Sequence, residues 1–132
     1  MEVIIRQTEN DAAQLTADLI ANALVEKPDL VLGLATGRTM EGLYARLAQK
    51  HAESGLDFSK GTTFNLDEYI GLPPEDPNSY RSYMNAHLFN KINIELANTF
   101  LPNGSAPDLD KECQDYEAKI AEHGGIDLQL LG

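Results

Sequence analysis

The stretch DLVLGLATGRTMEGLYARLAQK, residues 29–50, decides the fold class of this chain. Residues 29–35 form a nearly unbroken apolar run, which is typical of a strand buried on both faces of a parallel sheet. A short loop, TGRT at 36–39, leads into an amphipathic helix that we predict over residues 40–53, with Gly55 just past its end. A buried strand that passes through a short loop into a helix is the first half of a βαβ unit.

The same alternation continues on both sides of this stretch. Further strands are predicted over 2–6, 61–66, 98–102 and 126–131, and further helices over 8–27, 78–91 and 108–123. Strands that alternate with helices form right-handed crossovers and place their strands in parallel. The sequence therefore predicts an α/β fold, a Rossmann-like parallel sheet with flanking helices.

Composition narrows the class of protein. The 132 residues, 42% of them hydrophobic, suit one domain or a piece of a larger one. No apolar run is long enough to cross a membrane, and the N-terminal residues lack the features of a signal peptide. The single cysteine, Cys113, has no partner for an internal disulfide, so the cytoplasm is the expected location. The net charge of −11 argues against binding to nucleic acid but allows a small anionic ligand.

The loop after the strand at 29–35 is a candidate anion site. Gly37 allows close approach of the backbone, and the free N–H groups at a helix start favour an anion. Thr36 and Thr39 add hydroxyl groups, and Arg38 adds a guanidinium group suited to phosphate. The alternative is an ordinary turn, in which Thr39 caps the helix and Arg38 is solvated. The loop matches neither a Walker motif nor a GxGxxG fingerprint.

Two adjacent acids follow the predicted strand at 61–66. Asp67 and Glu68 lie on the same edge of the sheet as the candidate anion loop, and adjacent side chains point in different directions. One of them, near apolar walls, is a candidate base for proton transfer; the alternative is an acid that caps or pairs in a surface loop. The proline-rich chain through Pro77 suits a lid or a pocket wall.

Other residue types give weaker signals. The three histidines have no metal-ligand spacing, so no metal site is expected. Ser79 has neither a base partner nor a G-x-S-x-G frame, which argues against a serine nucleophile. Tyr80, Tyr83 and Phe89 have the spacing of core residues.

Four segments together resemble the glucosamine-6-phosphate deaminase (isomerase) family. The most specific is TTFNLDEYIGLPPEDPNSYRSYM at 62–84, in which an FNLDEYIGL block is followed by PNSY. The others are VLGLATGRTMEGLYARL (31–47), LPNGSAPDLDKECQDYE (101–117) and IDLQLLG (126–132). The resemblance covers essentially the whole chain in the right order.

The resemblance implies an enzyme of amino-sugar metabolism and of N-acetylglucosamine breakdown. Its members convert D-glucosamine 6-phosphate, a small sugar phosphate, to D-fructose 6-phosphate and ammonia without a cofactor, and some form homo-oligomers. Asp67 matches the base that moves a proton between adjacent sugar carbons. The loop formed by Thr36, Gly37, Arg38 and Thr39 matches the phosphate cradle. Glu68 receives no role from the resemblance, and neither does its neighbour Tyr69.

The chain departs from the family pattern at two places. Many members have Gly-Gly-Thr-Pro where this chain has Gly37-Arg38-Thr39-Met40. In the family, the strand matching 126–132 continues into a Gly-His-Ile loop that supplies ring-opening groups. We therefore expect residues 1–132 to be the N-terminal part of a single domain and to be inactive alone.

Two other functions compete with the deaminase. The first is a 6-phosphogluconolactonase-like hydrolase, which the tripeptide Asp67-Glu68-Tyr69 disfavours because that class has Asp-Glu-Arg. The second is a non-catalytic sugar-phosphate sensor that uses the same anion loop without turnover.

Overall fold

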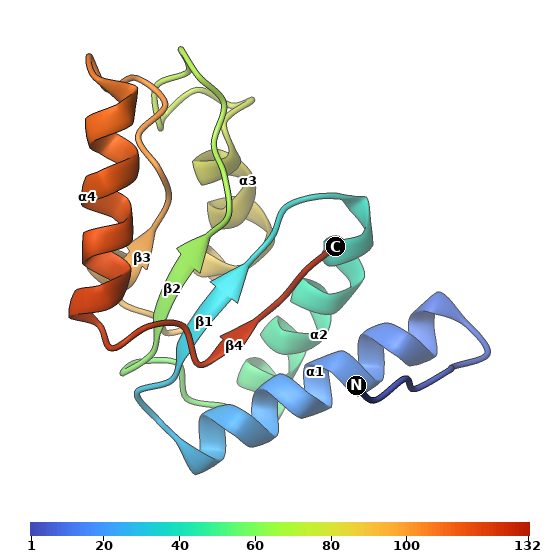
Figure 1. Cartoon of the computed structure of the whole chain (residues 1–132). Coiled ribbons are helices and arrows are strands. Elements are labelled where there is room, and N and C mark those ends of the chain that lie inside the picture. The colour runs from blue at the N-terminus through green and yellow to red at the C-terminus, as the bar shows by residue number, and fades with distance from the viewer.

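A four-stranded parallel sheet forms the centre of the protein (Figure 1). The computed structural model describes residues 1–132 throughout. The strands are β1 (Val31–Leu34), β2 (Thr62–Asn65), β3 (Thr99–Phe100) and β4 (Leu128–Gln129), in the spatial order β3-β2-β1-β4. The helices are α1 (Glu9–Glu26), α2 (Arg38–Ser54), α3 (Tyr80–His87) and α4 (Leu109–Glu122), with short 3₁₀ turns η1 (Phe89–Lys91) and η2 (Leu96–Asn98). The predicted α/β fold with a parallel sheet is confirmed.

The helices divide between the two faces of the sheet. The main apolar core joins β1 to the inward sides of α1, α2 and α3, through residues such as Leu24, Leu34, Leu47 and Met84. Helix α4 lies apart from these helices (Figure 1) and packs on Phe64 of β2 through an edge-to-face contact with Tyr116. No residue of α4 is fully buried, so this helix covers its face only thinly.

Local sequence explains where most helices begin and end. The Thr8 hydroxyl accepts the Asp11 N–H at 3.1 Å and caps α1, and Asp108 caps α4 in the same manner by accepting the Lys111 N–H. Helix α2 ends at Gly55, whose φ of +68° is the left-handed conformation common after helices. The predicted boundaries of α1, α2 and α4 are therefore confirmed within two residues.

Four predicted elements differ from the structure. The predicted strand over 2–6 is absent: these residues have no regular structure and are exposed, because no strand of the sheet lies beside them to complete its hydrogen bonds. The predicted helix over 78–91 ends at His87 and continues as the η1 turn. The predicted strands at 98–102 and 126–131 shorten to two residues each.

The order of the strands indicates the edge of the sheet at which a ligand site is expected. From β1 the chain steps to β2 and then β3 on one side, whereas β4 returns to the other side of β1. Crevices at the carboxyl ends of strands that diverge in this manner are the usual ligand sites of open α/β sheets. Gly132, beyond β4, lies at the start of α2 (Figure 1), where a Cβ built on it would stand 3.2 Å from Met40 Cε.

None of the helices combines the length and the apolar content that crossing a membrane requires.

Candidate functional site at the carboxyl edge of the sheet

The loop between β1 and α2 presents free backbone donors. Gly37 is the N-cap of α2, with φ +131° and ψ 164°, a combination open almost only to glycine. The N–H groups of Thr36 and Gly37 donate to no atom of the protein, and the first N–H groups of any helix lack intrahelical partners. Thr39 does not cap α2, so that part of the alternative is wrong, whereas its other part, a solvated Arg38, agrees with the structure. Arg38 is exposed and forms no ion pair.

Two tyrosines hold the carbonyl groups of this loop. The Tyr44 hydroxyl, from α2, donates to the Ala35 carbonyl. The Tyr83 hydroxyl, from α3, donates to the Gly37 carbonyl at 2.7 Å. Burial raises the pKa of both phenols, so both remain protonated donors at neutral pH.

Asp67 occupies the matching position at the end of the neighbouring strand. Leu34 and Asn65 are paired in the ladder, and the Leu66 N–H continues it by donating to the Leu34 carbonyl at 3.2 Å. Thr36 and Asp67 each follow their paired residue by two positions, so the structure brings them to the same edge on adjacent strands. The Asp67 side chain is exposed, without the apolar surroundings expected from the sequence.

Tyr80, the first residue of α3, is bonded to Tyr69, which follows Asp67 by two residues. Its hydroxyl donates to the Tyr69 hydroxyl at 3.2 Å, and the two rings lie 4.5 Å apart. The hydrogen bond with Tyr69 is the largest cause that raises the pKa of Tyr80, and burial is the next. The Thr36 hydroxyl lowers this pKa and the charge of Asp67 raises it, so both groups are within interaction range of the phenol. The helical spacing of the aromatic residues predicted a core position for Tyr80, and no signal in the sequence indicated this one.

Glu68 anchors the start of α3. Its carboxylate accepts the backbone N–H groups of Tyr80 at 2.8 Å and Arg81 at 3.0 Å, and also that of Tyr69 at 2.9 Å. A carboxylate at a helix start satisfies orphan donors and complements the positive end of the helix dipole. The two adjacent acids therefore differ in their contacts: Glu68 has a structural role that the sequence did not show, whereas the exposed Asp67 makes no hydrogen bond.

The proline-rich loop after β2 is fixed from two directions. The Ser79 hydroxyl donates to the Pro74 carbonyl at 2.8 Å. The Gly71 N–H donates to the Gly104 carbonyl at 2.8 Å, which joins this loop to the one after β3. Gly104 has no room for a side chain, because a Cβ would stand 1.9 Å from the Tyr69 carbonyl oxygen. The loop is a supported wall beside Asp67, consistent with the predicted pocket wall.

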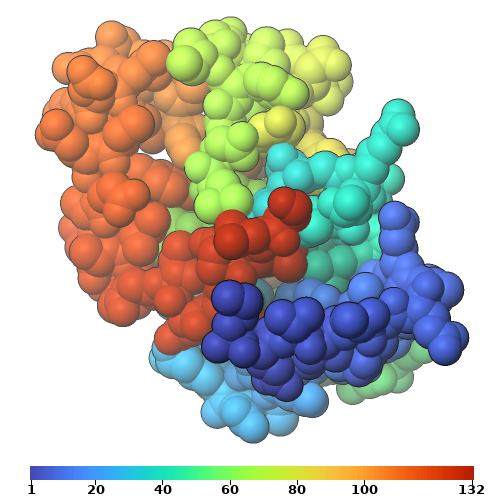
Figure 2. Space-filling model, turned by 45° about the vertical axis from the view of Figure 1, so that its right-hand side comes forward, coloured from blue at the N-terminus to red at the C-terminus, as the bar shows by residue number.

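A hollow of about 260 Å³ adjoins the candidate anion loop. Thr39 and Met40 line it on one side, Leu130 and Leu131 on another, and α1 closes it below. Figure 2 shows the C-terminal residues at the surface between α1 and the loops after β1 and β2. The hollow therefore lies where β1 and β4 diverge.

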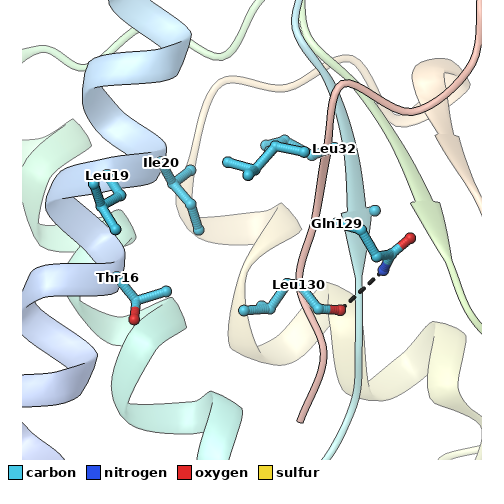
Figure 3. A pocket seen from close by; sticks show the side chains of 8 residues that line it. Thr16, Leu19, Ile20, Leu32, Gln129 and Leu130 are labelled. Carbon is cyan, nitrogen blue, oxygen red and sulfur yellow. Dashed lines mark hydrogen bonds between the residues drawn. The ribbon is translucent and has the colours of Figure 1, made fainter. Parts of the chain in front are cut away.

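A second, smaller hollow of about 90 Å³ lies between α1 and β4 (Figure 3). Ile20, Leu32 and Leu130 give it an apolar lining, and the Gln129 side chain turns to donate to the Leu130 carbonyl. It contains no predicted site residue.

These features define a class of protein: an open parallel α/β sheet with unpaired N–H groups at a helix start and a carboxylate on adjacent strand ends. A model of the family described as glucosamine-6-phosphate isomerases/6-phosphogluconolactonase matches residues 6–132. The chain belongs to this family.

Individual relatives agree with this assignment. The glucosamine-6-phosphate deaminases of Halothermothrix orenii and of a Geobacillus species are each 51% identical over the whole chain, which covers 55% and 53% of their lengths. A solved monomeric glucosamine-6-phosphate deaminase superposes over the whole chain with a TM-score of 0.97 at 47% identity, and 55% of it is covered. The 6-phosphogluconolactonase of Thermotoga maritima shares the fold, with a TM-score of 0.74 at 22% identity over 97% of this chain and 56% of its own. The chain spans about half the length of the curated relatives it matches.

Proposed function

We propose that residues 1–132 form the N-terminal part of a single-domain glucosamine-6-phosphate deaminase. The reaction takes D-glucosamine 6-phosphate and water to D-fructose 6-phosphate and ammonia. The observation that carries the proposal is the placement of the open N–H groups at 36–39 and of Asp67 on adjacent strand ends, in a chain about half identical to named deaminases. We place the reaction in the cytoplasm, in the breakdown of N-acetylglucosamine; association into a homo-oligomer stays a prediction.

The loop at 36–39 is the phosphate anchor in this proposal. The N–H groups of Thr36 and Gly37 are unpaired, the positive end of the α2 dipole adds attraction, and exposed Arg38 is free to reach a phosphate. An anchored phosphate fixes the position of the sugar chain relative to the strand ends. Held orientation is a large part of what an enzyme supplies in a proton-transfer step.

Asp67 is the enolisation base. It removes the proton from C2 of the opened sugar and returns it at C1, which moves the double bond and leaves an imine at C2 for water to hydrolyse. C2 is oxidised and C1 is reduced within one molecule, so the chemistry requires no external redox cofactor. The Tyr80 phenol, which donates to Tyr69 and whose pKa responds to Thr36 and Asp67, is a further candidate to contact the sugar.

A chimera tests the proposal. Residues 1–132 are joined to the part of the Halothermothrix orenii deaminase beyond the matched region, and ammonia release from glucosamine 6-phosphate is measured. We expect turnover that Asp67→Asn lowers by roughly 10²- to 10⁴-fold, the usual contribution of a positioned base. The unmodified relative is the positive control, and residues 1–132 alone are expected to release no ammonia. A chimera that is folded by circular dichroism yet inactive, or active and indifferent to Asp67→Asn, would contradict the proposal.

Product analysis separates the other candidates in the same experiment. Opening of a 6-phosphogluconolactone without ammonia release would support the hydrolase. Binding of glucosamine 6-phosphate that survives Asp67→Asn, with no product from either substrate, would support a sensor. The proposal requires ammonia and fructose 6-phosphate in equal amounts.

A further inference from the structure

We propose that two tyrosines, Tyr44 and Tyr83, are positioning residues of the loop at 36–39. Each holds a backbone carbonyl group and thereby sets the direction of the next N–H group along the chain. The inference rests on the proposed function only for the identity of the anion that these N–H groups bind.

Peptide geometry supplies the link between the carbonyl groups and the donors. In a planar trans peptide the carbonyl of one residue and the N–H of the next point in opposite directions. The Ala35 carbonyl is turned to the Tyr44 hydroxyl, so the Thr36 N–H points away from the core side of α2. The Gly37 carbonyl is turned to the Tyr83 hydroxyl at 2.7 Å, so the N–H of residue 38 points away from α3.

The loop needs such supports because its own conformation is costly. Gly37, with φ +131° and ψ 164°, has more backbone freedom than any other residue type and loses it here. The Gly37 carbonyl also accepts the Met40 N–H at 3.0 Å. This hydrogen bond by itself does not fix the backbone torsions where the chain passes from β1 into the loop. Tyr44 of α2 holds the carbonyl at the point where the chain leaves β1 and enters the loop. Tyr83 of α3, which lies 46 residues along the chain from Gly37, holds the carbonyl at the point where the loop enters α2.

A purely structural role is the alternative, and Tyr116 offers the matched control. Its hydroxyl also donates to a backbone carbonyl, that of Asn65 at 2.7 Å, and burial also raises its pKa. It belongs to α4, on the opposite face of the sheet, where its ring packs on Phe64, and it makes no hydrogen bond with the loop at 36–39. Tyr116→Phe thus removes the same kind of hydrogen bond while leaving the loop untouched.

The first experiment measures the direction of N–H groups in the ¹⁵N-labelled chain of 14.5 kDa by residual dipolar couplings. We expect Tyr83→Phe to change the coupling of Arg38 and Tyr44→Phe to change that of Thr36, with neither changed by Tyr116→Phe. Couplings that match the wild type in both loop variants would overturn the inference. If one of the two loop variants does not fold, the couplings of the other variant still test the inference.

The second experiment titrates the same proteins with inorganic phosphate, using chloride at equal ionic strength as the control. Saturable shifts of the amide signals of 36–39 are expected in the wild type, with binding weakened roughly 2- to 10-fold by loss of one hydrogen bond in Tyr83→Phe. Equal affinity in Tyr83→Phe and the wild type would overturn the inference. If the wild type does not bind phosphate, the proposed function loses its anion site. The residual dipolar couplings would still test whether Tyr44 and Tyr83 set the directions of the N–H groups.

Discussion

Replacing Glu68 by glutamine is expected to destabilise the chain by about 2 to 3 kcal/mol. The carboxylate accepts three backbone N–H groups, two of them at the start of α3. Glutamine keeps one carbonyl oxygen, for Tyr69 and Tyr80, but places an NH₂ group opposite the Arg81 N–H, where donor meets donor. Loss of a hydrogen bond to a charged group is worth about 1.5–3 kcal/mol, and loss of a charge at a helix start about 0.3–1 kcal/mol. The two contributions add to about 1.8–4 kcal/mol, and we take the lower half of that range because Glu68 is partly exposed.

Urea unfolding followed by circular dichroism measures this difference, from the shift of the midpoint at constant slope. Glu75→Gln is the matched control: Glu75 lies in the same loop, is exposed and accepts no hydrogen bond, so its replacement should stay within about 0.5 kcal/mol of the wild type. Asp67→Asn should also stay within this range, because the Asp67 side chain is exposed and makes no hydrogen bond. The two adjacent acids would then have distinct roles: Glu68 would stabilise the fold, and Asp67 would serve only in the reaction. If Glu68→Gln and Glu75→Gln unfold at the same urea concentration, Glu68 is not the anchor of α3.

Three further predictions concern other parts of the site and the fold. Tyr80→Phe in the chimera should lower kcat/KM for ammonia release by roughly 2- to 10-fold, the effect of losing one hydrogen bond. An unchanged kcat/KM would show that the Tyr80 hydroxyl does not act on the bound sugar. Gly104→Ala should destabilise the chain by about 2 kcal/mol in urea unfolding, since a Cβ 1.9 Å from the Tyr69 carbonyl forces apart two loops joined by two hydrogen bonds; a loss under about 0.5 kcal/mol would contradict this close approach. The hydrogen bond from the Ser59 N–H is the largest cause that lowers the pKa of Asp57 from 3.8 to about 2, so its stabilisation is present above pH 3.8 and is lost as the pH falls through about 2. Asp57→Asn should therefore flatten the dependence of stability on pH in that window, and an unaltered acid limb would show that this carboxylate is not responsible.

The parts of the fold that could be predicted from the sequence are those set by local pattern. The apolar run of β1, the caps at Thr8 and Asp108, and the left-handed glycine at 55 each depend on a few neighbouring residues. The predicted strand over 2–6 shows the limit of such patterns. Its β-branched residues favour an extended chain, but a strand also needs a neighbour for its hydrogen bonds, and a local pattern contains no information about that neighbour.

The relative placement of the candidate site residues was predictable to the same extent. The loop at 36–39 and Asp67 each follow a recognisable strand, and strand pairing brings them together. The contacts of Glu68 and of Tyr83 were not predictable, because their partners lie 12 and 46 residues away along the chain. Aromatic residues at helical spacing indicate a core, and only the tertiary structure shows that two of them turn their hydroxyl groups to the edge of the sheet.

Helix α3 links the two halves of the candidate site more directly than the sheet does. Its first turn is held by Glu68, the residue next to the proposed base. The same helix carries Tyr80 to the neighbourhood of Asp67 and Tyr83 to the carbonyl of Gly37. A shift of α3 would therefore move the anion loop and the acidic loop together, whereas the sheet alone fixes only where each strand ends. Proton transfer depends on the distance between an anchored substrate and its base. A single short helix bonded to both loops provides a means to hold that distance.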